Sequence, residues 1–192
     1  MYGHSRSAIY ISNLIITIVA SLICEIIFLL IVFLVGNLIY GNIQMPISNF
    51  IMNIINTMLT IISFCTIYNF ITIICSDITI STTLCICIFI AMFILASSTS
   101  YVLADIEPVI KKYEINSEGE KILVSEEENP NYPGTVKYNI MKAIYLLNPE
   151  SQATEIQNNN QEYAYQMPIY SLGLILVINL VGIWIFKEKQ LK

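Results

Sequence analysis

The sequence predicts an all-α integral membrane protein with four transmembrane helices. Of the 192 residues, 56% are hydrophobic and only 12% are charged, whereas a soluble domain carries about a quarter charged residues. The apolar residues lie in long runs, each near or above the roughly 20 residues that cross the hydrocarbon of a bilayer. Both ends of the chain are basic, which predicts that both termini lie in the cytoplasm and that the number of spans is even.

The first 104 residues are expected to contain three spans, at about 8–35, 51–75 and 80–102. An uncharged turn at Gly36–Asn42 separates the first two spans, and Pro46 is suited to open the second. A tight turn at Asp77 separates the second span from the third. Residues 168–192 are expected to form the last span and a basic cytoplasmic tail.

Residues 105–167 are expected to form a large acidic extracellular loop, because they contain eleven acidic residues and only five lysines. The stretch Val109–Val124 alternates around Gly119, which predicts a small β-hairpin. The stretch Glu126–Gly134 is polar and rich in turn residues, which predicts a solvated segment. Val136–Leu147 has apolar residues at helical spacing and predicts a short amphipathic helix lying on the outer surface.

The sequence has no pattern of catalytic, cofactor-binding or metal-binding residues. His4 is the only histidine, so the chain cannot form a histidine-based triad or a multi-histidine metal site. The five cysteines lie in or next to apolar runs and are interpreted as small packing residues. There is no Gly-x-x-x-x-Gly-Lys-Ser/Thr loop, so ATP cannot be bound through a Walker site. We therefore expect that the chain is not an enzyme, binds no nucleic acid, and takes its energy from a partner or an ion gradient.

Polar residues inside the spans are the candidates for function. Glu25 lies within the first span, where a carboxylate is costly against lipid, so we expect it to face the bundle interior or a wet cavity. It either contacts a substrate or a proton, or serves as a protonated or hydrogen-bonded structural group. Asn49, Asn53 and Asn56 recur at i, i+4 and i+7 and so share one face of the second span. Their amides either form interhelical hydrogen bonds or line a polar translocation path.

Four features occur in order along the chain. They are Gly3-His4-Ser5-Arg6 with Ile9–Ser12, then Ala104–Pro108 leading into the acidic loop, then Glu128–Tyr132 and Tyr145–Ala153 within the loop, and finally Phe186–Lys192. Together they resemble the permeases of bacterial ABC transporters of the type 2 exporter class, in which a Leu-Pro-x-Gly-Gln-Ala element precedes the last span. Relative to that element, Asn148 is inserted and Ser151 stands in place of glycine. Family members usually have six spans, so the chain resembles their C-terminal two-thirds. The resemblance therefore implies a truncated form, a fragment or half of a split subunit.

The resemblance implies a membrane-spanning permease subunit, or part of one, of an ATP-driven exporter in a bacterial cell membrane. ATP would be bound and hydrolysed by a separate cytoplasmic ABC-type ATPase, and a second permease chain and membrane lipid are the other partners implied. His4, Ser5 and Arg6 would lie beside the region that couples to the ATPase. The alternative is a truncated or non-transporting membrane protein whose acidic outer loop binds a partner, as in a sensor or an assembly factor.

Overall fold

The computed structural model describes residues 6–41, 46–75, 77–115 and 121–188. Over these residues the protein has six helices and two strands, and four of the helices are long and apolar enough to cross a membrane. The predicted class, an all-α multi-pass membrane protein, is therefore confirmed. The elements are α1 (Arg6–Tyr40), α2 (Ile47–Ile74), α3 (Ile78–Asp105), β1 (Val109–Ile115), β2 (Lys121–Glu128), α4 (Thr135–Leu147), α5 (Pro149–Gln157) and α6 (Met167–Glu188).

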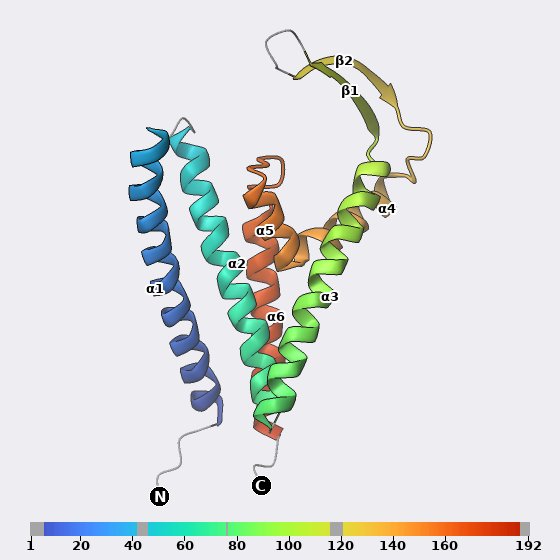
Figure 1. Ribbon diagram of the computed structural model, residues 1–192. Coiled ribbons are helices and arrows are strands. Elements are labelled where there is room, and N and C mark those ends of the chain that lie inside the picture. Colours follow the sequence, from blue (N-terminus) through green and yellow to red (C-terminus); the bar gives the residue numbers. More distant parts are fainter. Residues whose placement is uncertain (1–5, 42–45, 76, 116–120, 189–192) are drawn as a thin grey trace, which may run out of the picture.

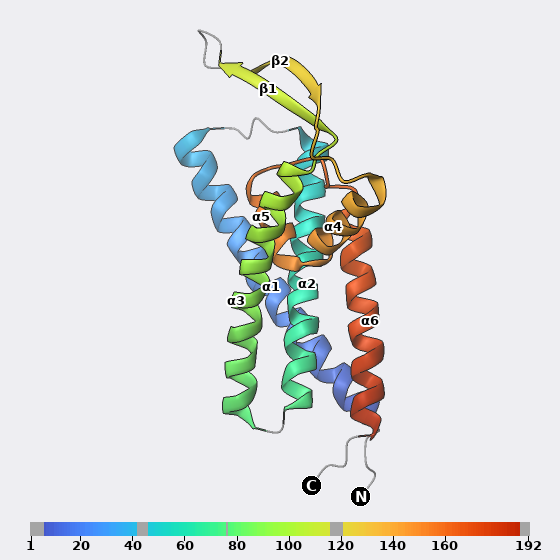
Figure 2. The ribbon, with the colours of Figure 1, turned by 90° about the vertical axis from the view of Figure 1, so that its right-hand side faces the viewer.

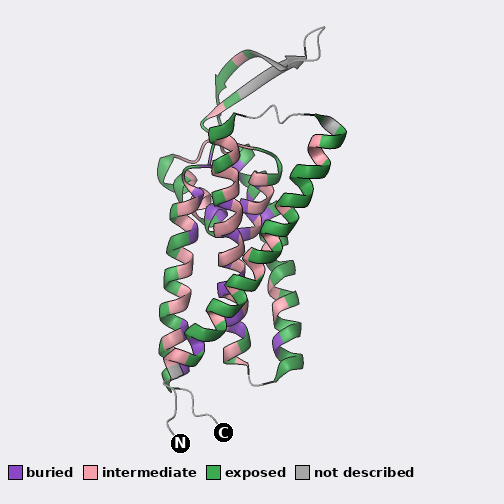
Figure 3. Ribbon diagram, turned by 90° about the vertical axis from the view of Figure 1, so that its left-hand side faces the viewer, coloured by how far each residue is buried: buried purple, intermediate pink, exposed green. Residues whose placement is uncertain are grey.

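The four long helices α1, α2, α3 and α6 run in alternating directions, so both ends of the chain lie at the same end of the bundle (Figures 1 and 2). The hairpin of β1 and β2 stands beyond the opposite end. The most buried of the four spans is α2, and it contacts α1, α3, α5 and α6. Buried residues lie mostly in the interior of the bundle, while the outward faces of the helices are exposed (Figure 3). These outward faces are apolar, as expected for helices surrounded by lipid.

The first helix is longer than the sequence indicated. It continues through Gly36 to Tyr40, so the turn expected at Gly36–Asn42 does not begin at Gly36. A single glycine costs only about 1 kcal/mol in a helix, and the apolar run on either side of it is long enough to continue the helix. The chain leaves the helix at Gly41, whose φ of 80° is a conformation that glycine adopts without strain. Asn42 lies outside the described residues.

Asp77 fixes the start of α3. One oxygen of its carboxylate accepts hydrogen bonds from the backbone N–H groups of Thr79, at 2.7 Å, and Ile80, at 3.1 Å. These bonds satisfy donors that would otherwise lack a partner at the first turn, and the negative charge suits the positive end of the helix dipole. The turn between the second and third spans is therefore held by a helix cap.

The hairpin is tied to the end of α3. β1 and β2 pair in antiparallel fashion, and the turn expected around Gly119 lies outside the described residues. β2 continues to Glu128, so the acidic residues Glu126–Glu128, expected in a turn-rich segment, belong to an exposed strand. The side-chain amide of Asn129 donates to the carbonyl oxygens of Asp105, at 2.7 Å, and Glu107, at 2.8 Å. These two hydrogen bonds hold the base of the hairpin against the C-terminal end of α3.

The second half of the expected outer loop contacts the spans. The stretch predicted as a short amphipathic helix forms α4, which contacts α3 and α6. Tyr145 and Leu146 in α4 are buried against Leu103 of α3 and Met167 of α6. The apolar side chains whose spacing predicted the helix, Ile140, Ile144 and Leu147, are exposed, and their position on the outer surface stays a prediction.

Helix α5 was not predicted, and it lies beside the upper halves of the spans (Figures 1 and 2). Just before it, the side-chain amide of Asn148 donates to the carbonyl oxygen of Met92, at 2.8 Å. Gln152 of α5 accepts a hydrogen bond from Thr60 at 3.1 Å. Met92 and Thr60 lie midway along α3 and α2, so the chain enters the bundle from the hairpin end, reaches about half its depth, and returns.

The first and last spans meet at Tyr10, which is fully buried. Its hydroxyl donates to Oδ1 of Asn179 on α6, at 3.1 Å, and its ring centroid lies 6.5 Å from that of Phe186. Gly182 lies under the same ring. A Cβ at this position would come within 2.7 Å of Cζ of Tyr10, closer than side-chain atoms pack in proteins.

Gly182→Ala is expected to lower the free energy of unfolding by about 1–3 kcal/mol, the usual cost of overpacking a well-packed contact. The measurement is the apparent melting temperature of the detergent-purified protein, which should fall by several degrees. Gly173→Ala is the matched control, because a Cβ at Gly173 on the same helix has nothing within 4 Å. Adding Tyr10→Leu to Gly182→Ala should recover part of the loss, and equal melting of the two alanine variants would contradict this packing.

Candidate functional site

A line of buried polar side chains runs along one face of α2. Its members are Asn56, Thr60, Ser63, Thr66 and Asn69, and none is more than 5% exposed. Because they recur every three or four residues, they share one face of the helix, and they extend over about 20 Å at 1.5 Å per residue. We call these five residues the polar seam. Buried polar side chains of this kind in a membrane bundle either form interhelical hydrogen bonds or line a polar path.

Gln152 of α5 joins the polar seam to two other helices. Its Oε1 accepts hydrogen bonds from the hydroxyls of Thr60 on α2, at 3.1 Å, and Ser171 on α6, at 2.7 Å. Its Nε2 donates to the carbonyl oxygen of Leu146 at the end of α4, at 2.6 Å. The side chain is 1% exposed. The amide of Gln152 therefore joins α5 to α2, α6 and the end of α4. It does so at a depth where lipid offers no alternative hydrogen-bond partner.

Two of the three asparagines singled out in the sequence bond to the segment that precedes α6. The side-chain amide of Asn56 donates to the carbonyl oxygen of Ala164, at 3.0 Å, and that of Asn53 donates to Oδ1 of Asn159, at 3.1 Å. Asn49 is half-buried and, within the described residues, forms no hydrogen bond with this segment. Asn53 and Asn56 thus contact the segment that precedes α6, and Asn49 forms no such hydrogen bond within the described residues.

Parts of this region have unused hydrogen-bonding capacity. Among the described residues, the buried atoms Oδ1 of Asn56, Oγ1 of Thr66 and Oγ of Ser151 have no hydrogen-bond partner. An unsatisfied buried polar atom costs about 1–3 kcal/mol, so water or a polar solute that reached these atoms would be bound favourably. Two of these atoms belong to the polar seam, and Ser151 belongs to the first turn of α5.

A second polar cluster lies nearer the hairpin end. The hydroxyl of Tyr145 donates to Oε1 of Glu155, at 2.5 Å, and both side chains are buried. Burial raises the pKa of Tyr145, and the hydrogen bond to Glu155 raises it further, so the phenol remains the donor. With Glu107 and Glu162 the pair lines a cavity of about 160 Å³. Within the described part of the chain, Asp, Glu, Cys and His side chains do not gather in threes as a metal site requires.

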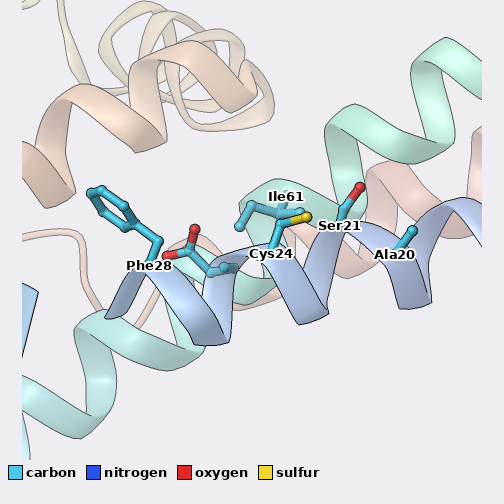
Figure 4. Close-up of a pocket in the computed structure, with 6 residues that line it drawn as sticks. Ala20, Ser21, Cys24, Phe28 and Ile61 are labelled. Atoms are coloured by element: carbon cyan, nitrogen blue, oxygen red, sulfur yellow. The ribbon is translucent and has the colours of Figure 1, made fainter. Parts of the chain in front are cut away.

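Glu25 lies midway along α1 and is half-buried. It lines two hollows, one of about 480 Å³ on the side of α1 that faces α2 and one of about 280 Å³ that extends to α5. Figure 4 shows Ser21, Cys24 and Phe28 of α1 around the larger hollow, with Ile61 of α2 opposite. No described residue forms a hydrogen bond or an ion pair with the Glu25 carboxylate. The side chain therefore points into the bundle without a partner.

Of the residues expected beside a coupling region, Arg6 is the first residue of α1 and lies at the terminal end of the bundle (Figure 1). His4 and Ser5 lie outside the described residues. The end of α6 lies at the same end of the bundle (Figure 1), and it carries Lys187 in its last turn. The sequence-based candidates thus fall into two groups, one at this end and one around α2 and α1 within the bundle.

The sequence analysis missed α5 and Gln152, although a local signal was present. Oδ1 of Asn148 accepts a hydrogen bond from the backbone N–H of Glu150, at 3.1 Å, and Pro149 occupies the first helical position. Asparagine at the cap, proline next and an acid in the first turn form a typical helix start. That signal predicts a helix, but it carries no information on how deeply the helix enters the bundle.

Comparison with known proteins does not assign the chain to a family. No protein-family model, no curated protein and no solved structure matches it. A functional proposal therefore rests on the residues of this chain, on their arrangement and on the motifs in the sequence.

Gln152→Leu is expected to lower the free energy of unfolding by about 1–3 kcal/mol, because the hydroxyls of Thr60 and Ser171 lose their shared acceptor inside the bundle. Gln157→Leu makes the same chemical change on an exposed position of α5 and should have little effect. Thermal unfolding in detergent measures both. If the two variants melted at the same temperature, Gln152 would not be the bridge described above.

Proposed function

We propose that the chain is the membrane-spanning permease subunit, or part of one, of an ATP-driven exporter in a bacterial cell membrane. The observation that carries the proposal is the polar seam, which extends about 20 Å along the most buried span and is met at mid-depth by α5. A bundle that only anchored an outer domain would not need a continuous polar face on its most buried span, because small and apolar residues are enough to pack transmembrane helices. The order of the sequence motifs supports the same assignment.

In this proposal the four spans form one side of the path. Most residues of α1 and α3 are exposed, including their large apolar side chains, and these faces would be covered by lipid and by a second permease chain. Gln152 would hold α5 against α2 and α6 in one state of the cycle. Its few hydrogen bonds are each worth only about 1 kcal/mol in a membrane, so a separate ATPase supplies ample energy to exchange them for others.

The terminal end of the bundle would face the cytoplasm, because it carries the basic residues Arg6 and Lys187. In a cysteine-free background, Glu126→Cys on β2 should react with a membrane-impermeant maleimide in intact cells. Glu188→Cys, at the end of α6, should react only after the cells are permeabilised. Both positions are exposed, so accessibility across the membrane is the only variable. Labelling of both positions, or the reverse pattern, would contradict the proposed orientation.

Coupling to an ATPase is tested by changing the charge at the terminal end. Arg6→Glu is expected to reduce severalfold the vanadate-sensitive ATPase activity that co-purifies with the tagged chain from native membranes, because the basic flank that faces the cytoplasm is inverted. Lys137→Glu makes the same charge change at an exposed position of α4 and should leave that activity unchanged. The amount of chain inserted in the membrane is measured in parallel, since loss of insertion would explain lost activity differently.

Absence of co-purifying ATPase activity from the wild-type chain would count against the exporter. The alternative would then lead, namely a non-transporting protein whose acidic outer segment binds a partner.

A further inference from the structure

Glu25 is a carboxylic side chain with no basic residue beside it in the described bundle. Lys, Arg and His are absent from α2, α3 and α5, from α1 after Arg6 and from α6 before Lys187. Within the described residues, no hydrogen bond or ion pair reaches the Glu25 carboxylate. A lone carboxylate at the centre of a membrane span is costly, so a positive charge from outside the chain would lower its free energy.

The surroundings of Glu25 are those of a small-molecule site. The hollow of about 280 Å³ that it lines is bounded by apolar side chains from two helices, Ile61 and Phe64 on α2 and Ala153 and Ile156 on α5. The other polar residues of the lining are Thr57, Thr60 and Gln157. The hydroxyls of Thr57 and Thr60 already donate to the carbonyl oxygen of Asn53 and to Gln152. An apolar lining with a few placed polar groups and one charge is typical of pockets for organic ligands. The larger hollow, of about 480 Å³, shares Glu25 and Ile61 with it and adds Ala20, Cys24 and Phe28 of α1 to the apolar lining (Figure 4).

We propose that Glu25 and these two hollows form a binding site for an amphipathic organic cation, with its positive charge at the Glu25 carboxylate and its apolar body against Ile61, Phe64 and α5. Charge complementarity selects a cation, and the apolar lining selects one with a hydrophobic body. An inorganic cation is disfavoured, because the lining offers it only one carboxylate and few other oxygen ligands.

The position of α5 decides whether the smaller hollow exists. Ala153, Ile156 and Gln157 form its wall on one side, and Gln152 anchors the same helix to α2 and α6. A ligand in the hollow therefore contacts the element that enters the bundle from the hairpin end. The inference that the cation is a cargo rests on the proposed export function. The inference that this site binds the cation does not.

The test is equilibrium dialysis of the full chain, purified in uncharged detergent, against radiolabelled tetraphenylphosphonium. Tetraphenylborate, which has nearly the same shape and the opposite charge, reports binding that does not depend on charge. The wild-type chain should bind the cation at least tenfold more tightly than the anion. Glu25→Gln should weaken binding of the cation about tenfold or more, since about 1.4 kcal/mol corresponds to tenfold, and should leave binding of the anion no weaker. Glu126→Gln, an exposed carboxylate on β2, is the matched control and should change neither.

A second variant tests the location without touching the charge. Ala153→Trp should fill the smaller hollow from α5 and weaken binding of tetraphenylphosphonium severalfold, whereas Ala91→Trp on the exposed face of α3 should not. This pair still decides the question if Glu25→Gln does not fold. Equal binding of cation and anion, or unchanged binding in Glu25→Gln and Ala153→Trp, would overturn the proposal.

Two further outcomes would assign the site to another occupant. In nanodiscs, displacement of tetraphenylphosphonium by phosphatidylethanolamine would give the site to a lipid ammonium group and would overturn the assignment to a free cation. A change from oligomer to monomer in Glu25→Gln, with no cation binding by the wild type, would give Glu25 to an interface between copies of the chain. These experiments involve no ATPase, so failure of the binding site and failure of the proposed export function are distinguishable.

Discussion

The arrangement of this bundle depends on the hydrogen bonds of one buried amide, that of Gln152. It accepts from Thr60 on α2 and Ser171 on α6 and donates to the end of α4. A segment that enters a membrane bundle must satisfy its polar groups within the protein, because hydrocarbon offers no partners. Gln152 and Asn148 meet that requirement at mid-depth, and the packing of Tyr145 and Leu146 between α3 and α6 follows from where they hold the chain.

The central position of α2 follows from the same constraint. Part of its polar face is covered by groups that bond to it, namely Gln152 of α5 and the carbonyl oxygen of Ala164 before α6. Ser171 of α6 takes part indirectly, since its hydroxyl donates to Gln152. By contrast, α1 contacts α2 and α6, and most of its large apolar side chains are exposed. Glu25 is the exception on α1, since it is an ionisable residue that faces the bundle and not the lipid.

The sequence motif Tyr145–Ala153, which contributed to the resemblance to exporter permeases, falls where α4 ends and α5 begins. Asn148, inserted relative to the family element, caps α5 and also bonds to the backbone of α3. Ser151, which replaces glycine, is fully buried and leaves its hydroxyl without a partner among the described residues. Both positions therefore lie near the deepest part of the segment that enters the bundle.

The sequence by itself determined the membrane class and the four spans, because a long apolar run is stable in a bilayer as a transmembrane helix. The alternating direction of the spans and the common location of the two ends follow from an even number of spans. The sequence also placed Asn53 and Asn56 on one helix face, since that follows from helical spacing alone. Only the tertiary structure decided that α4 packs against α3 and α6 and that α5 reaches the middle of the bundle, because amphipathic spacing does not say which surface a helix packs against. For the same reason the partners of Gln152 and the surroundings of Glu25 were not predictable, since they depend on contacts between segments about 20 to more than 100 residues apart in the chain.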